Sequence, residues 1–196
     1  MNNKSLNKIL DLIKEEIIPM TKAGIKLGNK IFGAAIIKKN DFSTVIVGTN
    51  SEIENPLWHG EIATLKKFYE IPASFRPHTK DCYFISSHEP CSLCLSAISW
   101  CGFDNFYYLF SFKDTLDKFN IPHDLNILKE VFNVNNGNYN KSNFYWKCYH
   151  LEELINNSKD NHKEEILNKL TNIKALYEHM SKYYQSTKIN NEIPLK

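Results

Sequence analysis

Two short segments of this 196-residue chain carry residue types that together can bind and use a metal ion. The first is a His-Gly-Glu triplet with His59 and Glu61, and the second is a Pro-Cys-x-x-Cys motif with Cys91 and Cys94. One histidine and two cysteines form a three-ligand set for a catalytic zinc ion, which keeps its fourth position open for water. Glu61 follows the histidine by two residues and is the natural proton carrier for that water. We therefore expect one zinc ion per chain, held by His59, Cys91 and Cys94.

The chemistry that these residues predict is hydrolysis. Zinc lowers the pKa of a water molecule towards neutrality, so that hydroxide is present at physiological pH. Glu61 can accept the proton and deliver it to a ring nitrogen and then to a leaving amine. Hydroxide attack on an amidine-like carbon gives a tetrahedral centre that loses ammonia. H-x-E followed by P-C-x-x-C is the signature of zinc-dependent base deaminases, whereas either half alone is weak evidence and leaves a structural zinc site open.

Each half of the motif is expected to begin a helix. Cys91 and Cys94 are three residues apart, so their side chains share one face of a helical turn. Pro90 suits a helix start, where its missing N–H costs nothing. A helix N-terminus also favours thiolate over thiol, because its N–H groups are unpaired. The apolar spacing of residues 59–70 predicts the second helix, with His59 at its start.

Short apolar segments alternate with helical ones in the rest of the chain, which predicts an α/β fold around a largely parallel sheet. Gly33 would weaken its strand, unless something such as a ligand approaches the backbone closely there. The expected strands are residues 31–38 and 43–48, which form a hairpin, then 82–86 and 105–110, with a late strand or packed edge segment at 144–150.

Helical spacing recurs towards both ends of the chain. One apolar stripe runs along residues 4–28, and Pro19 should end or kink that helix. Shorter helices are expected at 114–120 and 122–132. A C-terminal helix from residue 162 to about 184 either caps the sheet or packs on a second subunit.

The amino-acid composition favours an ordered globular protein that binds a small molecule. Hydrophobic residues make up 42% and aromatic residues 13% of the chain, as in an ordered globular protein. The formal net charge is +2 and no basic run is clustered, so a nucleic-acid partner is a weaker expectation than a small molecule. No apolar run approaches the roughly 20 residues that span a bilayer, and no signal peptide is recognisable.

Five cysteines, an odd number, do not indicate a disulfide framework, and we expect a reduced, cytoplasmic protein without a membrane partner. The chain shows no internal repeat and no interdomain linker. We expect one domain over residues 1–196, with a motif-bearing core at about 30–132 and a C-terminal helical extension at about 150–184.

At the motif the sequence resembles the cytidine deaminase superfamily, in particular its branch of bacterial guanine deaminases and tRNA adenosine deaminases. This resemblance implies a three-layer α/β/α fold with a five-stranded mixed sheet and an added C-terminal helix, usually assembled as a homodimer. The residues that carry it are Phe-Gly-Ala-Ala at 32–35, Gly-Thr-Asn at 48–50, Asn-Pro at 55–56 before the His-Gly-Glu triplet, and EPCSLCLSAI at 89–98.

The same resemblance implies roles in substrate binding. Phe32 would stack on the base, Asn50 would hydrogen-bond its ring edge, and Trp100 would help to wall the pocket. Asp124, expected in a lid loop, would read the amino edge of a purine.

Two further residues adjoin the motif. Trp58 precedes a metal ligand, which favours a place in the pocket wall over one in the core. His88 either contacts the substrate or a metal ligand, or is a satisfied polar residue at a strand end. The cysteines Cys82, Cys101 and Cys148 lie in apolar contexts, which is typical of packed thiols.

These residues leave several hypotheses open for the substrate and the class of protein. The first hypothesis is a deaminase of a free nucleobase or nucleoside, with guanine or a related aminopurine or aminotriazine as the substrate. An RNA-editing adenosine deaminase and a cytosine or cytidine deaminase are alternatives within the same chemistry. A non-catalytic zinc-stabilised interaction module is the alternative from another class.

Overall fold

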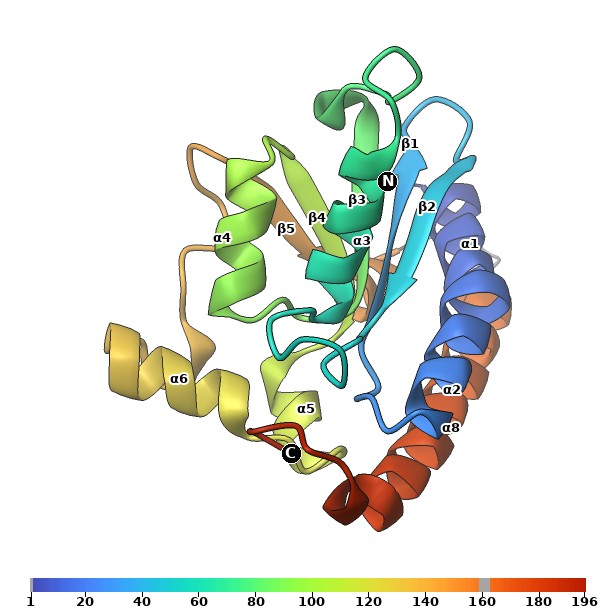
Figure 1. The fold of residues 1–196 in the computed structure, drawn as a ribbon. Coiled ribbons are helices and arrows are strands. Elements are labelled where there is room, and N and C mark those ends of the chain that lie inside the picture. The colour runs from blue at the N-terminus through green and yellow to red at the C-terminus, as the bar shows by residue number, and fades with distance from the viewer. Residues whose placement is uncertain (1, 159–162) are drawn as a thin grey trace.

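A five-stranded sheet lies between two layers of helices in the computed structural model, which describes residues 2–158 and 163–196 (Figure 1). The strand order is β2-β1-β3-β4-β5. This arrangement confirms the expected three-layer α/β fold with a five-stranded mixed sheet. The strands are β1 (Gly33–Lys38), β2 (Thr44–Thr49), β3 (Cys82–His88), β4 (Asn105–Phe110) and β5 (Lys147–His150).

The sheet is parallel in only half of its pairings, so the expectation of a largely parallel sheet was wrong for the pairing of β1 with β3, whereas the expected β1–β2 hairpin is confirmed. β1 pairs antiparallel with both β2 and β3, whereas β3, β4 and β5 run parallel. The short turn after β1 returns the chain directly into β2, which forces an antiparallel pair. Because β1 and β3 also run antiparallel, the end of β3 lies beside the start of β1 at one edge of the sheet. The fifth strand also lies beyond the expected motif-bearing core.

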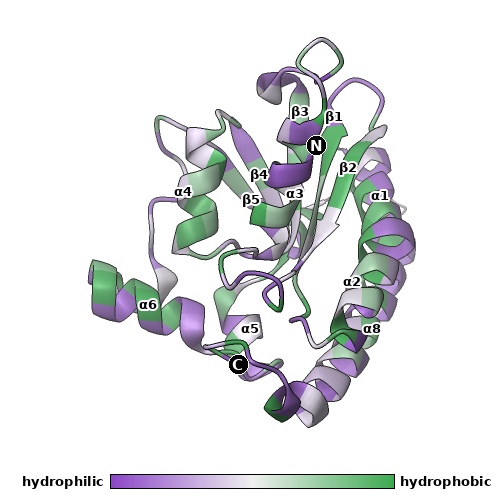
Figure 2. Ribbon diagram, in the orientation of Figure 1, coloured by the Kyte–Doolittle hydropathy of each residue, from purple (hydrophilic) through white to green (hydrophobic). Residues whose placement is uncertain are grey.

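One face of the sheet is covered by α3 (Gly60–Glu70) and α4 (Ser92–Trp100), as the motif predicted. Apolar side chains from both helices pack on the strands; Figure 2 shows the hydrophobic residues along β1 and β2. This packing fixes the helices against the sheet, and with them the residues at their first turns. The buried cluster on this face includes Ala34, Ile36, Leu65, Phe68, Phe84, Ile98, Phe106 and Tyr108.

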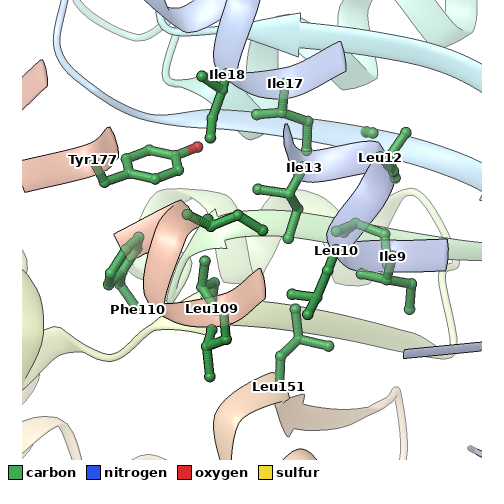
Figure 3. Close-up of a cluster of buried hydrophobic side chains, with 14 of the residues drawn as sticks. Ile9, Leu10, Leu12, Ile13, Ile17, Ile18, Leu109, Phe110, Leu151 and Tyr177 are labelled. Atoms are coloured by element: carbon green, nitrogen blue, oxygen red, sulfur yellow. The ribbon is translucent and has the colours of Figure 1, made fainter. Parts of the chain in front are cut away.

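The other face is covered by the helices from the two ends of the chain, which lie side by side (Figure 1). These are α1 (Asn3–Leu12), a π-helical turn (Ile13–Ile17), α2 (Ile18–Lys26), α7 (Leu151–Asn156) and α8 (Lys163–Thr187). α8 packs on α1 and α2 and joins the core under β4 (Figure 3). The C-terminal helix therefore caps the sheet; its expected first residue, 162, lies outside the described residues.

Pro19 neither ends the N-terminal helix nor breaks its course. The π-helical turn comes immediately before it, and the N–H of Ile18 bonds back to the carbonyl of Ile13. Pro19 then occupies the first turn of α2, where no N–H is required. The wider turn absorbs the proline, so the apolar stripe continues along the sheet.

Two further helices and the segment after α8 complete the edge of the sheet where β3 and β4 end. α5 (Phe112–Asp117) begins at a capping box formed by Ser111 and Asp114. α6 (His123–Phe132) follows, and the segment after α8 returns beside it (Figure 1), with the carbonyl oxygen of Lys196 3.4 Å from Nε2 of His123. Short 3₁₀ turns lie at Thr79–Asp81, Asn135–Gly137 and Lys188–Asn190.

In the described part of the chain, no helix combines the length and the apolar character needed to cross a bilayer.

Gly33 does not mark a ligand position. A β-carbon there would lie 2.7 Å from Cγ2 of Ile17 and 2.7 Å from Oγ1 of Thr21. The N-terminal helices thus approach the start of β1 so closely that only glycine fits. The close approach expected at Gly33 is therefore made by the N-terminal helices of the same chain.

Gly48 in β2 offers a test of the packing that holds α3. A β-carbon there would lie 2.9 Å from the backbone nitrogen and Cα of Thr64, atoms that cannot rotate away. We expect Gly48→Ala to destabilise the protein by about 1–3 kcal/mol through overpacking, measured by urea unfolding. The matched control is Gly24→Ala in α2, where the nearest contact is a threonine methyl group at 3.3 Å and alanine favours the helix. Equal stability of the two variants would contradict this account of α3.

Candidate metal centre

The predicted metal ligands come together at the sheet edge where α3 and α4 begin. His59 is the N-cap residue of α3, Cys91 is the N-cap residue of α4, and Cys94 lies in the first turn of α4. Nδ1 of His59 is 3.3 Å from Sγ of Cys91 and 3.8 Å from Sγ of Cys94. The two sulfur atoms are 3.5 Å apart. Among the described residues, these three form the group of potential ligand atoms able to hold one metal ion.

The distances among these atoms fit a tetrahedral zinc ion. With Zn–S bonds of about 2.3 Å and a Zn–N bond of about 2.0 Å, tetrahedral angles place two sulfur ligands about 3.8 Å apart and sulfur about 3.5 Å from nitrogen. The observed separations of 3.5, 3.3 and 3.8 Å lie within a few tenths of an ångström of these values. The three side chains therefore need almost no rearrangement to bind zinc and leave a fourth position free.

Mutual interactions shift the ionisation of the ligands. A hydrogen bond with Cys94, together with His59, holds the pKa of the Cys91 thiol well below its usual value, although burial opposes the shift. Burial and the neighbouring Cys91 charge raise the pKa of Cys94. Burial lowers the pKa of His59, but the contact with Cys91 and the charges of Cys91, Glu52 and Glu61 outweigh it and raise the pKa to about 9. This buried, electron-rich donor set is one that a divalent cation neutralises.

Glu61 lies beside the ligands and is almost fully buried. Its Oε1 accepts a hydrogen bond of 2.9 Å from Oγ of Ser86, and its Oε2 lies 3.3 Å from Sγ of Cys94. Burial raises the pKa of the Glu61 carboxyl, and the Cys91 charge raises it further. The carboxyl group is thus held next to the centre by the end of β3 without belonging to the group of three ligands, as an acid/base residue requires.

Asp124 lies near the same centre, but on a helix and not on the expected lid loop. It occupies the first turn of α6 and is partly buried. Burial raises the pKa of its carboxyl well above the ordinary value, and the charges of Cys91 and Glu61 act in the same direction while His59 and Lys30 oppose them. The helix α6 contacts α4, the helix at whose start Cys91 and Cys94 lie.

Asn50 is buried at the same edge, and its amide already has partners in the protein. Oδ1 accepts from the backbone N–H groups of Lys30 and Glu52 at 3.3 and 3.2 Å. Nδ2 donates to Oε2 of Glu52 at 2.6 Å. A hydrogen bond from Asn50 to a base therefore stays a prediction, since the structure shows the amide bonded within the protein.

Two predicted pocket residues lie on different surfaces. Trp58 is partly exposed in a groove shared with Asn50, and Nζ of Lys66 lies 5.5 Å from the centre of its ring. Trp100, the last residue of α4, is 90% exposed and shares a shallow hollow with Ser99 and Tyr145. The nine-residue helix α4 separates Trp100 from the metal ligands at its other end, so a place for Trp100 in the pocket wall stays a prediction.

His88 is buried in an aromatic cluster below the centre. Its ring contacts the rings of Phe32 at 4.7 Å, Phe110 at 4.9 Å and Phe119 at 5.2 Å between centroids. Nδ1 is 2.9 Å from Oγ of Ser87, whereas Nε2 has no hydrogen-bond partner among the described residues. Burial lowers the pKa of His88 to about 3, so the ring is neutral. His88 packs beneath Phe32 and does not reach a metal ligand.

Three residues at the centre were not recognised from the sequence. Ser86 holds Glu61, while Glu52 and Lys30 form a buried ion pair of 2.8 Å next to His59. No short motif marks them, because serine, glutamate and lysine are common at strand ends and in loops. The pairing of β1 with β2 brings Lys30 beside Glu52, and the pairing of β1 with β3 brings Ser86 to the same edge of the sheet.

The fold and the donor set define a class of zinc-binding α/β proteins with a free carboxyl group beside an open metal position. The chain belongs to the cytidine and deoxycytidylate deaminase family, since residues 8–110 match the zinc-binding region of that family.

Similar proteins agree with this placement. Guanine deaminase from Bacillus subtilis is 32% identical over 71 residues, which cover 35% of this chain and 43% of that protein. A protein crystallised in complex with 2,6-diaminopurine has 14% identity and a TM-score of 0.50, over 87% of this chain and 78% of its own. A tRNA:A34 deaminase structure has 21% identity and a TM-score of 0.43, over 50% of this chain and 75% of its own. At 14% identity, the match with a TM-score of 0.50 bears on the fold alone.

Metal removal by substitution tests the ligand set. We expect Cys91→Ser and Cys94→Ser to lose most of their zinc, because an alcohol is a much weaker ligand than a thiolate. Atomic absorption on purified protein would show about one zinc ion per chain in the parent and a small fraction of that in the variants. The control is Cys101→Ser, just beyond the far end of α4, which should keep its zinc. Full zinc content in either ligand variant would contradict the assignment.

The buried neutral His88 predicts a loss of stability at mildly acidic pH. The unfolded chain binds a proton at this residue near pH 6.5, whereas the folded protein does so only near pH 3. Above pH 6.5 the neutral ring therefore costs the folded protein nothing. As the pH falls from 6.5 towards 3, the unfolded chain binds the proton and the folded protein does not, so the free energy of unfolding decreases. Between pH 7 and pH 5 this proton binding lowers the free energy of unfolding by about 2 kcal/mol, measured by urea unfolding. The variant His88→Phe should lack this component; an identical pH dependence in both proteins would refute it.

Proposed function

We propose that this chain is a zinc-dependent hydrolytic deaminase of a free nucleobase or nucleoside, with guanine or a related aminopurine as its substrate. One observation carries the proposal. The buried carboxyl of Glu61 lies 3.3 Å from a ligand sulfur while the three metal ligands are complete without it. A structural zinc site would need a fourth protein ligand and no buried free carboxyl beside it.

Glu61 performs the proton transfers in the proposed reaction. Zinc at the three ligands would lower the pKa of a water molecule and direct it at the amino-bearing carbon of the base. Ser86 binds Oε1 of Glu61, which leaves Oε2 facing the centre to accept a proton from the water. The same carboxyl would then donate that proton to the ring nitrogen, take the proton of the newly added hydroxyl group and deliver it to the amino group, which would leave as ammonia. Overall, water replaces the amino group, and guanine would give xanthine.

The substrate proposal has two supports. The first is the 32% identity with the guanine deaminase of Bacillus subtilis in the matched 71 residues. The second is Asp124, which lies in the first turn of α6, a helix that contacts α4. A carboxylate can accept hydrogen bonds from a ring N–H and an exocyclic amino group together, which is the edge that guanine presents. Phe32, whose backbone lies against Gly60 next to the ligand His59, is our candidate for stacking on the base.

Ammonia release tests the proposed function. Zinc-replete protein should release ammonia from guanine or a related aminopurine in a panel of bases, nucleosides and tRNA. Glu61→Gln should lower the rate by at least about 100-fold, because it removes the proton carrier and keeps the shape. Zinc content should be unchanged in that variant. The control on the same helix is the exposed Glu70→Gln.

Two outcomes would overturn the proposal. Absence of ammonia release across the whole panel from metal-replete protein would favour a non-catalytic zinc module. Full turnover by Glu61→Gln would remove Glu61 from the reaction. Release from tRNA alone would keep the chemistry and replace the substrate class.

A further inference from the structure

We propose that Glu52 is a positioning residue for the metal ligand His59, and that the buried ammonium of Lys30 holds Glu52 in place. The inference rests on the metal site of the proposed function but not on its substrate. It adds an outer set of residues, contributed by the loops before β1 and after β2, to the centre formed by α3 and α4.

The orientation of the imidazole is the first step. Nδ1 of His59 faces both sulfur atoms, so Nε2 points away from them. Nε2 lies 3.7 Å from Oε1 of Glu52. When Nδ1 donates its lone pair to a metal, Nε2 must carry the hydrogen, and a carboxylate on that side selects this tautomer. The separation exceeds a hydrogen bond by about 0.5 Å, which a small rotation of the ring closes.

The second step is the rigidity of Glu52. Its Oε1 accepts from Nζ of Lys30 at 2.8 Å, and its Oε2 accepts from Nδ2 of Asn50 at 2.6 Å. The side chains of Glu52 and Lys30 are only 4% and 5% exposed. Asn50 also accepts the backbone N–H groups of both residues and so joins the two loops. Each carboxylate oxygen therefore has a fixed partner, and Oε1 also faces the imidazole.

The third step is the cost of placing these charges inside the protein. A buried ion pair seldom stabilises a fold more than apolar residues of the same volume would. Because the ion pair lies next to Nε2 of His59, we assign it a role at the metal site and not in folding alone. A fixed carboxylate behind a metal-bound imidazole orients the ring and makes it a stronger donor.

Zinc affinity and the spectrum of the Co²⁺-substituted protein test the proposal without reference to deamination. Glu52→Gln keeps the shape and removes the charge. We expect it to weaken zinc binding about 10–100-fold in competition with a chelator. The visible absorption of the Co²⁺ protein should shift, because the imidazole donor changes. Lys30→Met should act in the same direction, and the exposed neighbour Glu54→Gln is the control.

A double variant covers the case in which a single variant does not fold, since breaking a buried pair leaves one charge alone. Glu52→Leu combined with Lys30→Met removes both charges and should fold, yet bind zinc about 10–100-fold more weakly than the parent. Parental zinc affinity and an unchanged Co²⁺ spectrum in either Glu52 variant would overturn the proposal. Loss of turnover with parental affinity would instead make Glu52 a substrate contact. A protein that bound zinc as predicted but released no ammonia would refute the proposed function and leave this inference standing.

Discussion

The pairing of β1 with β3 is the constraint on which the metal centre depends. Ala34 pairs with Ser86 in an antiparallel register, and the N–H of Gly33 donates to Oγ of Ser87 at 2.9 Å. Because side chains alternate along a strand, Ser86 faces α3 and reaches Glu61, whereas Ser87 faces the opposite layer. A slip of one residue would exchange these faces and remove the support of the carboxyl group. The register thereby joins residues that are 25 positions apart in the sequence.

The sheet edge that results is polar and buried at the same time. Glu61, Glu52 and Lys30 lie there with little exposure, and each has a charged or hydrogen-bonding partner within the protein. Glu89, just before α4, accepts from the N–H of Phe112 and from the hydroxyl of Tyr139. Satisfied buried groups of this kind restrict motion, because any displacement leaves a charge without a partner. The ligands are consequently held near the geometry that zinc requires.

The two apolar layers serve this edge in different ways. α3 and α4 carry the reactive residues and pack on one face, so their first turns are fixed by the contacts of their later turns. On the other face the helices from both ends of the chain bury Tyr177 against the aromatic cluster of His88 and Phe110. That cluster contacts the ring of Phe32, whose backbone carbonyl lies against Gly60, the residue after His59.

The sequence by itself determined the metal ligands, the carboxyl group beside them and the helices that begin at them, because each depends on residue type and on spacing within one turn. It also indicated the strands, since short apolar segments leave few other conformations. Only the tertiary structure decided which strand lies beside which, and therefore that Lys30 and Glu52 stand behind His59. It likewise placed Trp100 on the surface and His88 in the core, although both adjoin the motif. The physical reason is that burial and partners depend on pairings between distant segments, for which local spacing carries no information.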